Sequence, residues 1–204
     1  FLTIIDFHSL NDRGIYTDLL LEFQKSGHEL HIISPTQYSN KGTDHLVKEH
    51  ENVNIYKPRI LTLQKTNLIK KGIATLTLER KYLRCVKKYC KDIAFDLVVY
   101  STPPITFIKT LGYLKKSTDV ISLLLLKDIF PQNAVDLGML TKTGLRGIVY
   151  RYFRNKEKRL YVLSDYIGCM SNRNKQYLLE HNQMIDEETV SILPNSIRVQ
   201  NPLQ

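Results

Sequence analysis

Short apolar segments alternate along this chain with stretches of helical periodicity. The most apolar segment, residues 120–126, reads VISLLLL and would present apolar side chains on both faces of a strand. Such strands are typical of a parallel sheet that is covered on both sides. Further segments of strand type lie at residues 1–6, 28–34, 53–58, 96–104, 166–170 and 190–193. The pattern predicts an α/β fold: a Rossmann-like, doubly wound, mainly parallel sheet of about seven strands with helices on both faces.

The length and composition fit one large domain. The chain has 204 residues, of which 43% are hydrophobic, enough for a core. No apolar run approaches the roughly 18 residues that span a bilayer, and no secretory signal is visible at the start. Three cysteines, Cys85, Cys90 and Cys169, follow neither a disulfide framework nor a zinc spacing, so we expect reduced structural thiols. The histidines show no metal-binding spacing either, and no metal site is predicted.

Positive charge is concentrated in one helical segment. Residues 65–91 hold nine Lys or Arg and one acid, Glu79, in a chain of net charge +9. Their apolar positions follow helical spacing, which predicts an amphipathic helix with a cationic outer face. This face is either a solvated surface or a contact for anionic lipid headgroups. Nucleic acid is disfavoured because no nucleic-acid-binding motif accompanies the charge. The candidate lipid contacts are Lys70, Lys71, Arg80, Lys81, Arg84, Lys87 and Lys88.

Ligands of such a sheet bind outside the carboxyl ends of the strands, so the loops that follow strands are the candidate site. In the first loop, Gly14 begins a helix and allows close backbone approach to a phosphate, with Arg13 beside it. The turn STPP supplies the hydroxyls of Ser101 and Thr102. The purely structural alternatives are a simple turn at Gly14 and a capping turn at the STPP segment.

Two charged residues, Lys127 and Asp128, follow directly after the 120–126 strand. They form either a salt bridge that holds the loop or the reactive pair at the mouth of the cleft. Near the end of the chain, Ser171 is expected to cap a helix that runs to Leu179. A short strand at 190–193 follows and stops at Pro194-Asn195.

Together these phrases resemble the first domain of family 4 (group 1) glycosyltransferases, two-domain enzymes of the GT-B fold. The closing strand, capped helix, strand and Pro194-Asn195 match the end of that domain. The phrase SGHEL at 26–30 is similar to the family's Gly-His-Glu-Val phrase, although Arg13-Gly14 stands where members usually have two glycines.

A second set of phrases points to the bacterial surface-polysaccharide subgroup. Its Arg-Asp-Leu-Trp-Pro-Glu phrase is matched by Lys127, Asp128, Phe130, Pro131 and Gln132. Many other members have a His-Asp pair here. Lys127 occupies the histidine position, so the histidine role does not carry over. The aromatic and acidic positions of the helix near 144–163 also resemble the family.

The resemblance implies an N-terminal, acceptor-binding domain at residues 1–197 and, at 198–204, the start of a linker to a C-terminal nucleotide-sugar domain. The whole enzyme would transfer a sugar, with retention, from a nucleotide-diphosphate sugar to a saccharide acceptor, often polyprenyl-diphosphate-linked. No metal or cofactor is expected. The enzyme would be cytoplasmic, peripheral on the inner face of the membrane, and residues 1–204 alone would be inactive.

The implied roles fall on the strand-end loops. Asp128 is the catalytic candidate, Gly14 and Arg13 contact the donor phosphate, and Ser101, Thr102 and Lys127 bind the acceptor. Two other hypotheses stay open: a non-catalytic Rossmann-type phosphate- or sugar-binding module, and a membrane-attached interaction module.

Overall fold

A computed structural model describes residues 1–6, 8–37, 44–60 and 68–197, with the side chains of the second helix described from Thr77 onward. The strands are β1 (Leu30–Ile33), β2 (Thr36–Gln37), β3 (His45–His50), β4 (Val53–Lys57), β5 (Arg59–Ile60), β6 (Leu97–Thr102), β7 (Ile121–Leu126), β8 (Tyr166–Cys169) and β9 (Val190–Ile192). The helices are α1 (Ile15–Lys25), α2 (Leu68–Tyr89), α3 (Ile108–Ser117), α4 (Gln132–Asp136), α5 (Gly144–Leu163) and α6 (Asn172–His181), with a 3-10 turn at Glu187–Thr189. The linker expected at 198–204 lies outside the described residues.

The principal sheet is mainly parallel, which confirms the predicted fold class. Its strands lie in the order β3-β4-β1 on one side and β6-β7-β8-β9 on the other. Leu2 joins the two halves through parallel bridges to Ile33 of β1 and Tyr100 of β6. Among the described strands of this sheet, only β3, at the edge, pairs antiparallel, with β4. The chain therefore leaves the centre of the sheet in both directions, and a crevice at such a switch point is where ligands of open α/β sheets bind.

The central strand is shorter than the expected 1–6 segment. In this segment only Leu2 forms ladder bridges, and the Thr3 N–H still donates to the Ile33 carbonyl at 3.1 Å. Beyond Thr3 the backbone bonds to side chains instead. The N–H of Ile5 donates to Thr3 Oγ1, and the Ser34 hydroxyl donates to the Ile5 carbonyl at 2.7 Å. Because these bonds satisfy the backbone without a neighbouring strand, the segment turns away from the sheet after Thr3.

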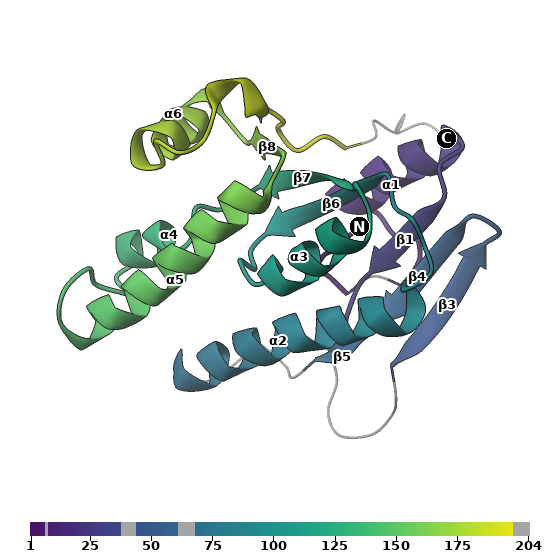
Figure 1. Cartoon of the computed structure of the whole chain (residues 1–204), viewed down its shortest axis with the longest axis horizontal. Helices are drawn as coiled ribbons and strands as arrows, with labels where there is room; N and C mark the ends of the chain where they lie inside the picture. Colours follow the sequence, from purple (N-terminus) through teal and green to yellow (C-terminus); the bar gives the residue numbers. More distant parts are fainter. Residues whose placement is uncertain (7, 38–43, 61–67, 198–204) are drawn as a thin grey trace, which may run out of the picture.

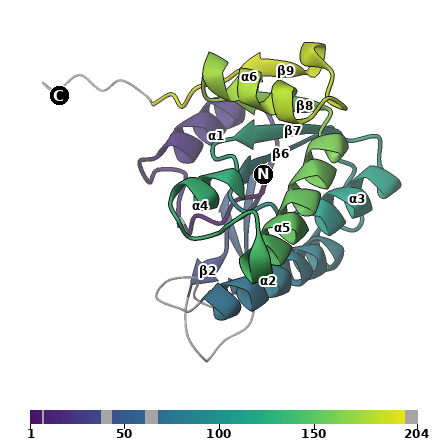
Figure 2. The ribbon, with the colours of Figure 1, turned by 90° about the vertical axis from the view of Figure 1, so that its left-hand side faces the viewer.

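Helices cover the two faces of the sheet unequally (Figures 1 and 2). On one face α1 packs through Tyr16 against Val99 and Leu125. On the other face α2, α3 and α5 form a layer over Tyr100 and Leu124. Neighbouring residues of β6 and of β7 thus belong to different cores, as the alternation of side chains along a strand requires. The segment 120–126 is apolar on both faces for this reason.

Two kinds of element were missed from the sequence. The edge strand β3 reads HLVKEH and is largely exposed, so it carries no apolar alternation, and its pairing with β4 alone defines it. Helix α4 has five residues, too few to display helical periodicity. The expected cap of the last helix is confirmed, since Ser171 Oγ accepts the Asn174 N–H at 3.2 Å. Gly27, with φ +86°, follows the end of α1.

Candidate functional site

Three of the predicted loops converge at the carboxyl edge of the sheet. Tyr16, in the first turn of α1, lies beside Ser101 at the end of β6. Burial raises the pKa of the Tyr16 phenol, the neighbouring Ser101 hydroxyl opposes this, and the nearby charge of Asp128 adds to it. The start of α1, the end of β6 and the loop after β7 therefore form one site.

Thr102 ties the ends of two strands together. Its hydroxyl donates to the Asp128 carbonyl and accepts the Lys127 N–H, both at 3.2 Å. Ser101 and Thr102 are each only 2% exposed. The Thr102 hydroxyl therefore positions the loop that carries Asp128. Contact of either Ser101 or Thr102 with an acceptor stays a prediction.

Lys127 and Asp128 differ in their surroundings. Lys127 is half-buried, and burial lowers the pKa of its ammonium, whereas Asp128 is exposed. The salt bridge that sequence reasoning offered as an alternative is not found among the ion pairs of the described residues. In the described part of the chain, Lys127 thus offers a partly desolvated cation beside a solvent-facing carboxylate.

A buried ion pair, missed from the sequence, supports the same edge. Lys57, at the end of β4, is 2% exposed and places Nζ 2.9 Å from Asp6 Oδ1 and 3.2 Å from Ser34 Oγ. This network joins the loop after the central strand to the ends of β1 and β4. The sequence signal for this buried pair was a lysine that directly follows the apolar residues Ile55 and Tyr56 of a strand. Tyr16 could be assigned to the site only from its position shortly after Gly14.

Gly14 precedes α1 but is not demanded by backbone geometry. Its φ of 177° is extended and open to any residue, and a Cβ there would meet Thr17 Oγ1 at 3.3 Å as its nearest neighbour. The Thr17 hydroxyl donates to the Gly14 carbonyl at 2.9 Å. Arg13 beside it is exposed. The helix start is thus exposed at Arg13 and half-buried at Gly14, and its role toward a donor phosphate stays a prediction.

The cationic helix has the predicted amphipathic form. Its inner face buries Leu78, Tyr82, Cys85 and Val86 against the sheet and α3. Among the candidate lipid contacts, Arg80, Arg84, Lys87 and Lys88 are exposed and Lys81 is half-buried, whereas the side chains of Lys70 and Lys71 lie outside the described part. The charge pattern is thus explained by a solvated helix face, and contact with lipid stays a prediction.

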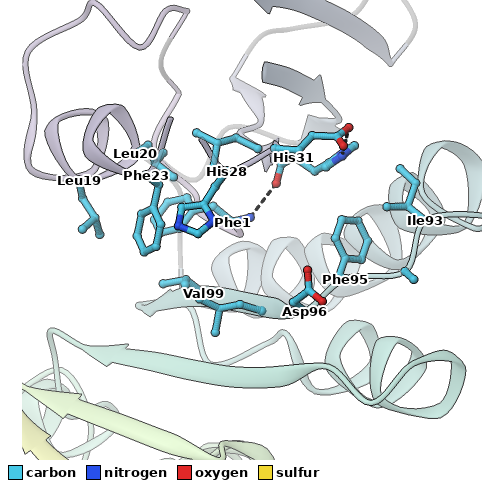
Figure 3. A pocket seen from close by; sticks show the side chains of 14 residues that line it. Phe1, Leu19, Leu20, Phe23, His28, His31, Ile93, Phe95, Asp96 and Val99 are labelled. Carbon is cyan, nitrogen blue, oxygen red and sulfur yellow. Dashed lines mark hydrogen bonds and ion pairs between the residues drawn. The ribbon is translucent and has the colours of Figure 1, made fainter. Parts of the chain in front are cut away.

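A cavity of about 440 Å³ lies at the opposite edge of the sheet (Figure 3). The rings of Phe1, Phe23 and Phe95 and the aliphatic side chains of β6 make its lining largely apolar. It faces the amino ends of β1 and β6, away from Asp128. It is therefore separate from the candidate site.

Within the described residues, no group of His, Cys, Asp and Glu side chains is arranged to hold a metal ion. No helix in the same residues combines the length and apolarity needed to cross a membrane. The three cysteines are free and buried, and burial raises the pKa of Cys85 to about 12.

Comparison with known proteins gives a likeness in structure and none in sequence. No family model matches the chain, and no curated protein matches it. Among 12 matching solved chains is the trehalose-6-phosphate protein from E. coli bound with UDP-2-fluoro glucose. The two share 10% identity at a TM-score of 0.55, over 88% of this chain and 41% of the other. The likeness supports the Rossmann-like fold as one half of a GT-B architecture, and this chain spans less than half the length of that neighbour.

Proposed function

We propose that this chain is the N-terminal, acceptor-side domain of a retaining glycosyltransferase of family 4. One observation carries the proposal: 88% of the chain superposes on part of a protein that binds a UDP-sugar analogue. The matched part is 41% of that protein. In our proposal a second domain, carrying the nucleotide-sugar site, faces the carboxyl edge of the sheet and closes the cleft.

The proposed chemistry assigns different tasks to the residues of the edge. Asp128, exposed and anchored through its own carbonyl to Thr102, orients the acceptor hydroxyl toward the anomeric carbon. Lys127 binds an anionic or polar part of the acceptor, since its ammonium is partly desolvated and without an ion-pair partner among the described residues. Gly14 and Arg13 contact the donor diphosphate at the start of α1. No metal is required in this scheme.

The acceptor we propose is a saccharide on a polyprenyl diphosphate, used in cell-surface polysaccharide synthesis. The exposed cations of α2 would then face anionic lipid at the cytoplasmic side of the membrane. Each cation near such a surface contributes about 1 kcal/mol, so a few suffice for reversible binding.

The test is sugar transfer by the full-length protein with radiolabelled nucleotide sugars and lipid-linked acceptors. Asp128→Asn should lower turnover about 100-fold, because an acceptor held in the wrong orientation loses that much. Asp119→Asn is the matched control. Asp119 is also exposed, but it lies before β7, at the opposite end of the same strand from Asp128. Equal activity of the two variants would remove Asp128 from the mechanism.

The 204-residue chain alone should transfer no sugar, since half of the proposed cleft is outside it. If the full-length protein also transfers none but binds UDP or a sugar phosphate, the alternative of a non-catalytic binding module replaces the proposal.

A further inference from the structure

The first half of α5 carries an apolar stripe that faces solvent. Leu145, Ile148, Val149 and Tyr152 follow the spacing i, i+3, i+4, i+7 and so share one face of the helix. Their exposed fractions are 85%, 55%, 42% and 42%. On a soluble domain this is the face that normally packs into the core. None of the four belongs to a core cluster of the described residues.

The length of the helix explains why the stripe is uncovered. A helix of 20 residues spans about 30 Å, whereas the six residues of β7 span about 20 Å. The second half of α5 buries Glu157, Leu160 and Tyr161 in the helix layer. The first half therefore extends past the carboxyl edge of the sheet, together with α4, as a protruding tip (Figure 1).

The tip is held in place by contacts on its other sides. Phe153 packs edge-on against Phe130 of the loop after β7, with ring centroids 5.1 Å apart. Just beyond the tip, in the second half of α5, Lys156 Nζ lies 3.5 Å from Glu79 of α2 and anchors the helix. At Gly147 a Cβ would come within 2.6 Å of the Lys142 carbonyl, so the preceding loop lies directly against the helix. The stripe is thus presented on a supported element.

The charge around the stripe selects its partner. Residues 137–153 contain three cations, Lys142, Arg146 and Arg151, and no acid. Arg154 and Lys156, which follow, form ion pairs with Glu157 and Glu79. Arg146 and Arg151 flank the stripe on its two sides, and both are exposed. Leu137 and Met139, which lead from α4 into the tip, are also exposed. A convex helix with large aliphatic side chains, flanking arginines and tyrosines matches the chemistry of a membrane interface rich in anionic lipid.

We propose that the tip formed by α4 and the first half of α5 inserts its apolar stripe into the interface of an anionic lipid bilayer, with Arg146 and Arg151 at the headgroups. This deepens the proposed function and rests on it only in so far as a lipid-linked acceptor requires a membrane. The tip lies beyond the same edge of the sheet as Asp128, so docking through it would bring the candidate site to the lipid surface.

The chain contains no tryptophan, which makes the insertion directly measurable. The variant Ile148→Trp carries one fluorophore in the stripe, and Val162→Trp carries one at an exposed position of the second half of α5. With vesicles of phosphatidylcholine and phosphatidylglycerol, Ile148→Trp should shift its emission to the blue and be quenched by brominated lipid. Val162→Trp should do neither. If the protein binds the vesicles but the emission of Ile148→Trp stays unchanged, the proposal is overturned.

Sedimentation with the same vesicles separates the contributions. Leu145→Ser combined with Ile148→Ser should weaken partitioning at least about tenfold, through the loss of buried apolar area. Arg146→Gln with Arg151→Gln should weaken it roughly 25-fold at low salt, at about fivefold per charge. The control pair is Arg159→Gln with Lys116→Gln, elsewhere on the surface, and the pair Arg80→Gln with Arg84→Gln measures the separate contribution of α2. Loss of binding only in the α2 pair assigns the membrane contact to α2 and refutes the tip.

The vesicle assays contain no sugar nucleotide, so their outcome is independent of glycosyl transfer. A blue shift of Ile148→Trp that depends on protein concentration without vesicles would show that a second copy covers the stripe. That result would also overturn the proposal.

Discussion

Replacement of Lys57 by methionine should lower the free energy of unfolding by about 3 kcal/mol. Lys57 Nζ lies 2.9 Å from Asp6 Oδ1, and the two side chains are only 3% and 16% exposed. At that distance, with an effective dielectric constant of about 20, the Coulomb attraction is about 6 kcal/mol. The cost of desolvating both charges offsets part of it. Methionine keeps most of the apolar stem but leaves the Asp6 carboxylate without this cation in a largely buried place.

The assay is urea unfolding monitored by circular dichroism. The midpoint of the transition should fall, while the slope of the unfolding free energy against urea concentration stays unchanged. For a domain of this length, 3 kcal/mol also corresponds to a fall of about 6–12 °C in Tm. In the double variant with Asp6→Asn much of the loss should be recovered, because no uncompensated charge remains buried.

The matched control is Lys25→Met. Lys25 Nζ lies 2.8 Å from Glu22 Oε1, almost the same separation, but the side chains are 44% and 64% exposed. An exposed pair of this kind contributes less than about 1 kcal/mol. Equal losses from Lys57→Met and Lys25→Met would refute the reasoning, which assigns the difference to burial alone.

Other substitutions test the packing and the titration of single groups. Gly168→Ala should cost about 1–3 kcal/mol, because its Cβ would lie 2.5 Å from Leu193 Cδ1. Gly112→Ala, in α3 with no atom within 4 Å, should instead stabilise by about 0.5–1 kcal/mol; a loss at both positions would contradict the steric argument. Partial burial favours protonation of Asp165, but hydrogen bonds from a lysine and a serine prevail and hold its pKa below the ordinary value. The ionised carboxylate therefore stabilises the fold at neutral pH, and this stabilisation is lost as pH falls through the lowered pKa. The urea midpoints of Asp165→Asn and of the parent chain should differ at neutral pH and converge in acid. A difference in midpoint that is constant with pH would exclude the linkage. Burial raises the pKa of Cys85 to about 12, so its thiol should react with an aromatic disulfide reagent at pH 8 only after unfolding. The reaction is followed by the absorbance of the aromatic thiolate that the reagent releases.

Much of the fold could be predicted from the sequence because it depends on local patterns. The 120–126 run predicted β7, helical spacing predicted α2 and α5, and Ser171 predicted the start of α6. The order of strand-end loops also predicted that Gly14, Ser101 and Asp128 would meet at one edge, since parallel strands end together. Tyr16 beside Ser101 and near Asp128 agrees with that expectation.

Other features depend on partners that are distant in the chain. Lys57 meets Asp6 across 51 positions, and Thr102 meets Asp128 across 26, so neither contact has a local signature. The exposed edge strand β3 exists only through its pairing with β4. Exposure of the stripe at Leu145 is of the same kind: its helical spacing alone would place it in the core.

The sequence by itself determined most of the strands and helices and which loops face the crevice, because periodicity and caps act within a few residues. Only the tertiary structure decided which polar groups are buried in pairs and which apolar face is left in water. Those outcomes depend on the relative lengths and packing of whole elements, such as a long α5 beside a short β7.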